Sequence, residues 1–319
     1  MAQSGISFST LRNLRWGASN ETFSFSSLRR EGGTFSTQSS VSLQTIRDYH
    51  IETGRFQGTT GVQAFAIPFS TVPRVFVQGW NIGTAPIVVT QVTASNFTFV
   101  RIVPETFTAN SDVRHALFWV AFPNESIRTH GTIGALSYNL GAFPNMSIST
   151  SNYTWPTPFT AAANHFVNLQ AHAYPNPTTT GLAWMRGMYP YSSPWSNVSS
   201  TVDYRTELVG SLPVESYVGA VLGIEQGYDA VHHIDCSYGI TNSSSLLTSN
   251  VTHIAPGSNM VCAIANVQTS NSSLGVFIHS TSSASSNVQF TLRKPASIGT
   301  SHIQEAVGTL LLRAKWLYI

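Results

Sequence analysis

Hydrophobic and polar residues alternate over short distances along most of this chain. From about residue 50 onward, β-branched and aromatic runs of four to eight residues, such as Phe97–Val100 and Ala116–Val120, stand between turns rich in Pro and Gly. No stretch keeps an apolar period of 3.6 residues for more than a turn or two. The pattern therefore predicts an all-β fold of antiparallel β-sandwich modules.

A strand block recurs ninety residues further along the chain. Pro68-Phe69 leads into Phe76-Val77, and Pro158-Phe159 leads into Phe166-Val167 with unchanged spacing. This repeat predicts at least two modules of related structure. Three segments further downstream also resemble one another and end in Arg: Phe99-Val100-Arg101, Trp184-Met185-Arg186 and Thr291-Leu292-Arg293.

Each module is expected to end in an apolar closing strand. Three segments have this character: Phe118–Phe122, Ala220–Ile224 and Lys315–Ile319. Together with the repeat, they predict three sandwich modules, near residues 51–124, 125–227 and 228–319.

The first fifty residues differ from the rest and contain a short internal repeat. Ile6–Arg12 recurs as Phe23–Arg29 and, more loosely, as Val41–Arg47. Such segments are too small to fold alone, so we expect residues 1–50 to be an extended anchor whose side chains insert into a larger structure. The alternative is a Ser-rich linker with chance similarity. The expected anchor residues are Phe8, Leu11, Arg12, Phe25, Leu28, Arg29, Ile46 and Arg47.

Charge and hydropathy exclude several classes of partner. Charged residues make up only 9% of the chain, against roughly 25% in an average soluble domain. The basic residues are spread along the chain without a cluster, so we expect no nucleic-acid partner. No apolar run approaches 18 residues, so we expect no membrane insertion. The opening MAQSGISFST has neither a basic nor an apolar region, so we expect no signal peptide.

Residues that could support catalysis are scarce. The chain has 14 acidic residues, and it contains no nucleophile elbow, phosphate-binding loop or zinc-protease motif. Glu105 and Asp112 share one loop, but chance proximity explains them better than a pair of catalytic carboxylates. His232 and His233 are adjacent, and adjacent strand residues point to opposite faces, so they would not bind one metal ion. We therefore expect no enzyme activity, metal site or cofactor.

Two groups of residues leave alternatives open. Cys236 and Cys262 either pair or remain buried free thiols. Tyr189, Tyr191 and Trp195 lie in a loop rich in Pro and Ser. Exposed rings on such a loop suit stacking against a sugar ring, whereas the alternative is burial against a neighbouring subunit.

Residues 51–122 resemble an H-type lectin domain. Four segments carry the resemblance: Thr53–Phe56, Ala66–Val77, Thr93–Arg101 and Trp119–Phe122. The resemblance implies a six-stranded antiparallel sandwich that assembles into trimers, with sugar sites near the subunit junctions. Apolar residues on both faces of Val75–Val77 agree with this, since a trimer interface needs a second buried surface.

The resemblance also places the expected sugar site. The family has a Trp after the strand equivalent to Phe97–Arg101 and tends to have an Arg on the strand equivalent to Ile87–Val92, and this chain has neither. Phe107 would replace the stacking ring, and the alternative is that the segment is only a polar loop. The sugar-binding candidates in this module are Arg101, Glu105, Phe107, Asn110 and Asp112.

The N-terminal repeat resembles short anchor segments of tailed-phage and algal-virus structural proteins. Together with the lectin-like module, it predicts a homotrimeric virion surface protein of fibre or tail type. Residues 1–50 would bind other virion proteins, and the modules would attach to host surface glycans. The alternatives are a purely structural virion protein, such as a capsid, collar or tail component, and a cellular lectin or adhesin exported without a signal peptide.

Overall fold

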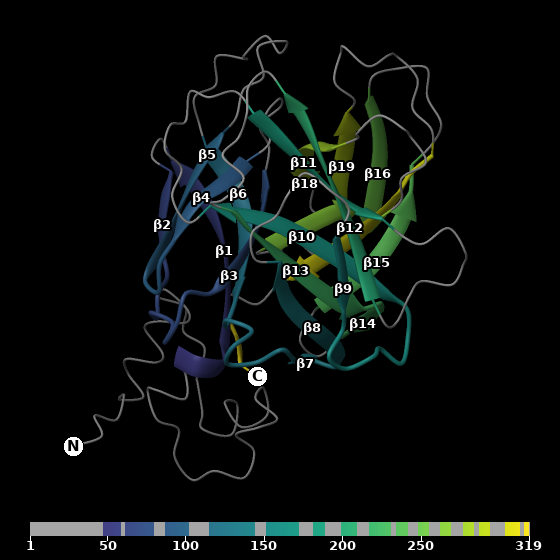
Figure 1. Ribbon diagram of the computed structural model, residues 1–319. Helices are drawn as coiled ribbons and strands as arrows, with labels where there is room; N and C mark the ends of the chain where they lie inside the picture. Colours follow the sequence, from purple (N-terminus) through teal and green to yellow (C-terminus); the bar gives the residue numbers. More distant parts are fainter. Residues whose placement is uncertain are drawn as a thin grey trace, which may run out of the picture.

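The computed structural model describes the β-rich body of the chain (Figure 1). The described residues are almost entirely strands, with one short helical turn at 47–49, so the predicted all-β fold is confirmed. Their ranges are 47–58, 61–79, 87–101, 115–143, 151–171, 181–188, 199–208, 217–230, 234–241, 248–254, 262–268, 277–283, 287–293, 304–312 and 316–318.

Unit 1 is a sandwich of two antiparallel three-stranded layers, and its outer layer continues into the inner layer of unit 2 through a parallel pairing of Val89 with Gln170. Its inner sheet has the order β1-β6-β3, and its outer sheet has the order β2-β5-β4. The strands are β1 (His50–Gly58), β2 (Val62–Ala64), β3 (Arg74–Gly79), β4 (Ile87–Val92), β5 (Asn96–Arg101) and β6 (His115–Phe122).

Unit 2 repeats this topology. Its inner sheet has the order β8-β13-β10 and its outer sheet the order β9-β12-β11. The strands are β8 (Leu136–Phe143), β9 (Ser151–Thr154), β10 (Ala163–Ala171), β11 (Gly181–Met188), β12 (Ser199–Leu208) and β13 (Tyr217–Glu225).

Unit 3 has the same topology again. Its inner sheet has the order β15-β20-β17 and its outer sheet the order β16-β19-β18. The strands are β15 (Ile234–Ile240), β16 (Thr248–Ile254), β17 (Cys262–Val267), β18 (Phe277–Ser283), β19 (Asn287–Arg293) and β20 (Ala306–Leu312).

Three short strands extend the inner sheets. β7 (His130–Ile133) pairs with β8, β14 (Gly227–Asp229) pairs with β15, and β21 (Trp316–Tyr318) pairs with β1. β7 and β8 form a hairpin with a two-residue loop, in which Gly134 has a φ of 60°. Glycine suits this loop because its first position takes a positive φ in the tight turns that match strand twist.

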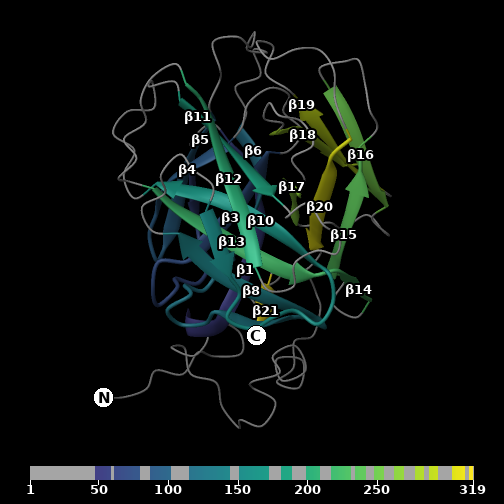
Figure 2. The same cartoon turned by 45° about the vertical axis from the view of Figure 1, so that its right-hand side comes forward.

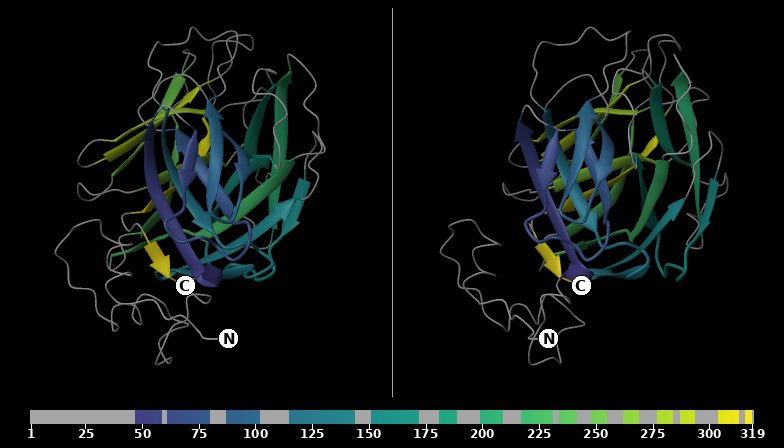
Figure 3. Two further views of the ribbon diagram at one scale, coloured as in Figure 1. Left: turned by 90° about the vertical axis from the view of Figure 1, so that its left-hand side faces the viewer. Right: turned by 60° about the vertical axis from the view of Figure 1, so that its left-hand side comes forward.

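The inner sheets of the three units meet at the centre of the molecule. The equivalent strands β3, β10 and β17 contact one another pairwise. Phe76, Phe166 and Ile264 from these strands belong to one buried cluster. Figures 2 and 3 show the blue, teal-to-green and green-to-yellow parts of the chain packed side by side around this region. The molecule therefore has a core shared by its three units.

Unit 1 also has a core of its own. Val75 lies between its two sheets with Phe97 and Trp119, whereas the next residue, Phe76, faces the shared centre. The two faces alternate because successive side chains of a strand point to opposite sides. The second buried surface expected for β3 is therefore present, but other parts of the same chain cover it. The homotrimer, which that surface had suggested, stays a prediction.

Two sequence-based strand matches are wrong. The closing strand of unit 3 is β20, whereas Lys315–Ile319 contains β21, which pairs with β1. Trp184–Arg186 lies in β11, the counterpart of β4, so it does not match Phe99–Arg101 in β5. Both errors have one physical cause: a short apolar run ending in Arg or an aromatic fits any strand with one buried face, and pairing alone decides its position.

Candidate functional site

The expected sugar site of unit 1 begins where β5 ends. Arg101 is the last residue of this strand, and its backbone pairs with Ile87 of β4. The chain then enters segment 102–114, which leads to β6. The candidates Glu105, Phe107, Asn110 and Asp112 in that segment lie outside the described residues. Tyr189, Tyr191 and Trp195, between β11 and β12, also lie outside them.

The topology shows that these two candidate groups are not equivalent. Segment 102–114 leaves β5 at its C-terminal end, whereas segment 189–198 enters β12, the counterpart of β5, at its N-terminal end. The two groups are therefore joined to opposite ends of equivalent strands. They would form two different sites.

Each candidate group is also confined to one unit. The counterparts of segment 102–114 are 209–216 and 294–305, and neither contains Phe, Tyr or Trp. Segment 189–198 corresponds to the three-residue connections 93–95 and 284–286, which also lack aromatic residues. Among these equivalent connections, Phe, Tyr or Trp side chains are therefore found only in segment 102–114 of unit 1 and segment 189–198 of unit 2.

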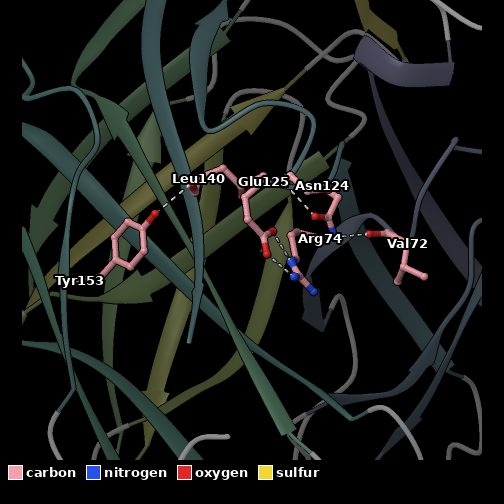
Figure 4. Close-up of polar contacts among 7 residues, drawn as sticks. Val72, Arg74, Asn124, Glu125, Leu140 and Tyr153 are labelled. Carbon is pink, nitrogen blue, oxygen red and sulfur yellow. Dashed lines mark hydrogen bonds and ion pairs between the residues drawn. The ribbon is translucent and has the colours of Figure 1, made fainter. Parts of the chain in front are cut away.

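The best-defined polar cluster within the described ranges lies at the start of β3 (Figure 4). Arg74 Nε donates to Glu125 Oε2 at 2.6 Å, and Arg74 Nη2 donates to the other carboxylate oxygen. The side-chain amide of Asn124 donates to the carbonyl of Val72 at 2.8 Å. These bonds fasten the turn after β6 to the chain that enters β3.

Tyr153 lies near the same cluster, on β9. Its hydroxyl donates to the carbonyl of Leu140 at 3.4 Å, and Figure 4 shows the ring directed toward β8. Burial and the negative charge of Glu125 raise the pKa of Tyr153. A side chain at Gly141 would overlap this ring, since a Cβ there would lie 2.0 Å from Tyr153 Cζ. The close packing indicates a structural role for Tyr153.

Units 2 and 3 are joined by a buried amide. The backbone N–H of His165 donates to Gln268 Oε1 at 2.9 Å, and Gln268 Nε2 donates back to the His165 carbonyl at 2.5 Å. Nearby, Asn164 Nδ2 donates to the carbonyl of Ser237 at 2.5 Å, and Gln226 Nε2 donates to Asn164 Oδ1 at 3.0 Å. These bonds satisfy polar groups that the shared core would otherwise leave without partners.

The imidazole of His165 is buried and packs edge-on against Trp155, with ring centroids 5.2 Å apart. Burial lowers the pKa of His165 to about 3, so the ring is neutral at physiological pH. The thiols of Cys236 and Cys262 are free and buried, and burial raises the pKa of each. Thiols in such surroundings are inert. The structure thus selects free thiols from the two alternatives that the sequence left open.

Two carboxylates bind backbone amides of the segments that lead into β3 and β10. Glu52 accepts hydrogen bonds from the N–H groups of Ala66 and Ile67, which precede β3. Glu225 accepts from the N–H groups of Thr160 and Ala161, which precede β10. Burial raises the pKa of Glu225. The backbone hydrogen bonds and those from the side chains of Ser137 and Thr160 lower it by more than burial raises it, so the net shift is downward. Both carboxylates hold the segment that enters the third strand of their own unit.

The described ranges contain no group of three or more His, Cys, Asp or Glu residues that could hold a metal ion. Within the same ranges, no helix is long and apolar enough to cross a membrane. Of the expected anchor residues, Arg47 is described, and its carbonyl accepts from the Ser70 N–H at 3.3 Å. The other seven lie outside the described residues.

No family model, no curated protein and no solved structure matches the chain. The fold itself defines an all-β protein of three sandwich units that share one strand topology.

Proposed function

We propose that the protein is a virion surface protein of fibre or tail type that attaches to host surface glycans through its β-sandwich units. The observation that carries this proposal is the threefold repetition of one six-stranded topology around a shared core. Such an arrangement is a rigid scaffold, and binding residues in proteins concentrate on connecting segments that a rigid scaffold positions.

The scaffold suits attachment by several weak contacts. Sites held on one rigid body act together, because binding at one site raises the effective concentration of ligand at the next. Segments 102–114 and 189–198 would supply two different sites on neighbouring units. Attachment through two unlike sites would favour glycans that display more than one kind of sugar.

Each segment has side chains suited to sugar recognition. In unit 1, Phe107 would stack on the apolar face of a sugar ring, while Arg101 and Asn110 would bind its hydroxyls. Glu105 and Asp112 would accept further hydroxyl hydrogen bonds. In unit 2, Tyr189, Tyr191 and Trp195 would provide the stacking surface.

Glycan binding is tested with the full chain on a broad glycan array. We expect saturable binding that falls about five- to 150-fold in Phe107→Ala and in Asn110→Ala, since loss of a stacking ring or of a hydrogen bond to a sugar hydroxyl costs about 1–3 kcal/mol. Ser95→Ala is the matched control, because Ser95 is exposed on the turn at the other end of β5. Binding that is lost equally in the control, or absent from a folded protein, would contradict the proposed sites.

The alternative function is a purely structural part of a virion, such as a capsid, collar or tail component. One observation favours it: the counterparts of segment 102–114 in units 2 and 3 lack Phe, Tyr and Trp. The fold would then serve packing within the particle, and residues 1–50 would bind other virion proteins. A folded chain that binds no glycan but is incorporated into particles through residues 1–50 would support this alternative.

A further inference from the structure

Each unit is followed by a short strand that pairs with the first strand of another unit. β7 follows the closing strand of unit 1 but pairs with the first strand of unit 2, and β14 follows the closing strand of unit 2 but pairs with the first strand of unit 3. β21 follows the closing strand of unit 3 and pairs with the first strand of unit 1. The exchange of edge strands therefore runs around a closed cycle.

Equivalent positions in the three units can be fixed independently of these edge strands. In each unit, the residue six positions after a Pro lies at or next to the start of the third strand. These residues are Arg74, Asn164 and Cys262, and the prolines are Pro68, Pro158 and Pro256. Their partners on the closing strands are Phe122, Ile224 and Leu312.

We call the path from a closing strand to the short strand that follows it a junction. The junctions that lead out of units 2 and 3 agree residue by residue. Four residues after Ile224, Tyr228 pairs with Asp235 of unit 3. Four residues after Leu312, Trp316 pairs with Glu52 of unit 1. Asp235 pairs with Leu311 and Glu52 pairs with Ala121. Leu311 and Ala121 directly precede Leu312 and Phe122, so Asp235 and Glu52 hold the same place in their sheets.

The junction leaving unit 1 follows the same plan with a longer path. His130 pairs with Asn139, which pairs in turn with Gly223, so Asn139 occupies the same place in its sheet. The path from Phe122 to His130 is eight residues, four more than in the other junctions. The added length includes the turn that carries Glu125, the partner of Arg74.

We infer that the chain is a single-chain counterpart of a cyclic trimer, and that β21 is the strand that closes the ring. β7 and β14 are covalently continuous with the strands they cover, whereas β21 joins the last part of the described chain to the first strand of the fold. Figure 3 shows this contact, with the short yellow strand beside the start of the purple β1. Without β21, the edge of β1 would expose unpaired backbone groups, which invite pairing with another chain.

Closure is tested first by removing β21. Deletion of residues 314–319 should speed amide hydrogen exchange at residues 50–52 by at least tenfold and lower the Tm, because these residues pair with β21. Exchange within β17 and β20 should change less, which separates local opening from global unfolding. Unchanged exchange at residues 50–52 in the deletion variant would overturn the inference.

A second variant tests whether closure occurs within one chain. Ile51→Cys combined with Leu317→Cys places thiols at directly paired positions, where a disulfide can form. We expect oxidation to give a disulfide in monomeric chains of 34.6 kDa and to raise the Tm. The matched control is Ile51→Cys with Tyr318→Cys, a pair displaced by one residue whose side chains point to opposite faces. A disulfide that forms only between chains, or equally well in the control, would refute intramolecular closure. Neither readout depends on glycan binding.

Discussion

Arg74 and Glu125 are 51 residues apart in sequence, yet two hydrogen bonds join the guanidinium of one to the carboxylate of the other. The Arg74 side chain is 10% exposed and the Glu125 side chain 25% exposed. The pair links the start of β3, at the centre of the molecule, to the turn that leads out of unit 1. It therefore stabilises the one junction whose connecting path is longer than the others.

Loss of one partner of this pair should destabilise the protein. Glu125→Ala leaves the largely buried guanidinium of Arg74 without its carboxylate, which should cost about 2–4 kcal/mol in the free energy of unfolding. Chemical denaturation measures the change. The double variant Arg74→Met with Glu125→Ala should recover part of the loss, because no buried charge remains. A double variant whose loss in free energy of unfolding exceeds the sum of the two single losses would contradict this account.

The amide of Gln268 should be needed for the contact between units 2 and 3. Gln268→Ala removes both hydrogen bonds to the backbone of His165 and should lower the free energy of unfolding by about 2–3 kcal/mol. Gln91→Ala is the control, since Gln91 is exposed on β4, and it should change stability by less than about 0.5 kcal/mol. Equal effects of the two substitutions would argue against a buried amide at this contact.

Stability should fall in mild acid because of His165. Its pKa is about 3 in the folded protein and near 6.5 when unfolded, so the unfolded state binds the extra proton between these values. The free energy of unfolding should therefore decrease as the pH falls from about 6.5 toward 3, with no contribution from His165 above that window.

His165→Val tests this pH dependence, because Val75 occupies the equivalent position in unit 1. The variant should have a flatter profile of unfolding free energy between pH 6.5 and 4 than the unsubstituted protein. Denaturation series at several pH values measure the slope. An identical slope would show that the imidazole does not become protonated on unfolding in this range.

Both cysteines should be unreactive until the protein unfolds. Cys236 and Cys262 pair with Leu310 and Leu312 on opposite sides of β20, so two strand spacings of about 4.8 Å separate their backbones, too far for a disulfide. A thiol reagent such as DTNB should label neither residue in the native protein and both in denaturant without a reducing agent. Fewer than two labelled thiols after unfolding would indicate a disulfide.

Several features of the fold follow from local sequence. Alternating apolar residues and frequent Pro and Gly predict strands, and the structure confirms an all-β fold. The equal spacing from Pro68 to Phe76 and from Pro158 to Phe166 identifies positions that are equivalent in the structure. Pro256 has the same spacing to Ile264, and this signal could have located the third strand of unit 3.

The residues that join the units were not predictable in the same way. Gln268, Asn164 and Glu125 are ordinary polar residues in the sequence, and their importance arises from backbone groups of distant strands. The expected sugar and anchor residues rest on a family resemblance, on the composition of one loop and on a short repeat. Apart from Arg47 and the backbone of Arg101, they lie outside the described ranges. Local pattern cannot rank such residues, because their partners are far away in sequence.

The sequence alone determined that this chain forms strands, where many of them lie, and that β3 has two buried faces. The tertiary structure decided what covers the second face and which strand closes unit 3. β20 and β21 are both short apolar runs, yet one completes a sandwich and the other pairs with β1. The physical reason is that side-chain alternation is a local property of the backbone, whereas strand pairing is set by non-local packing.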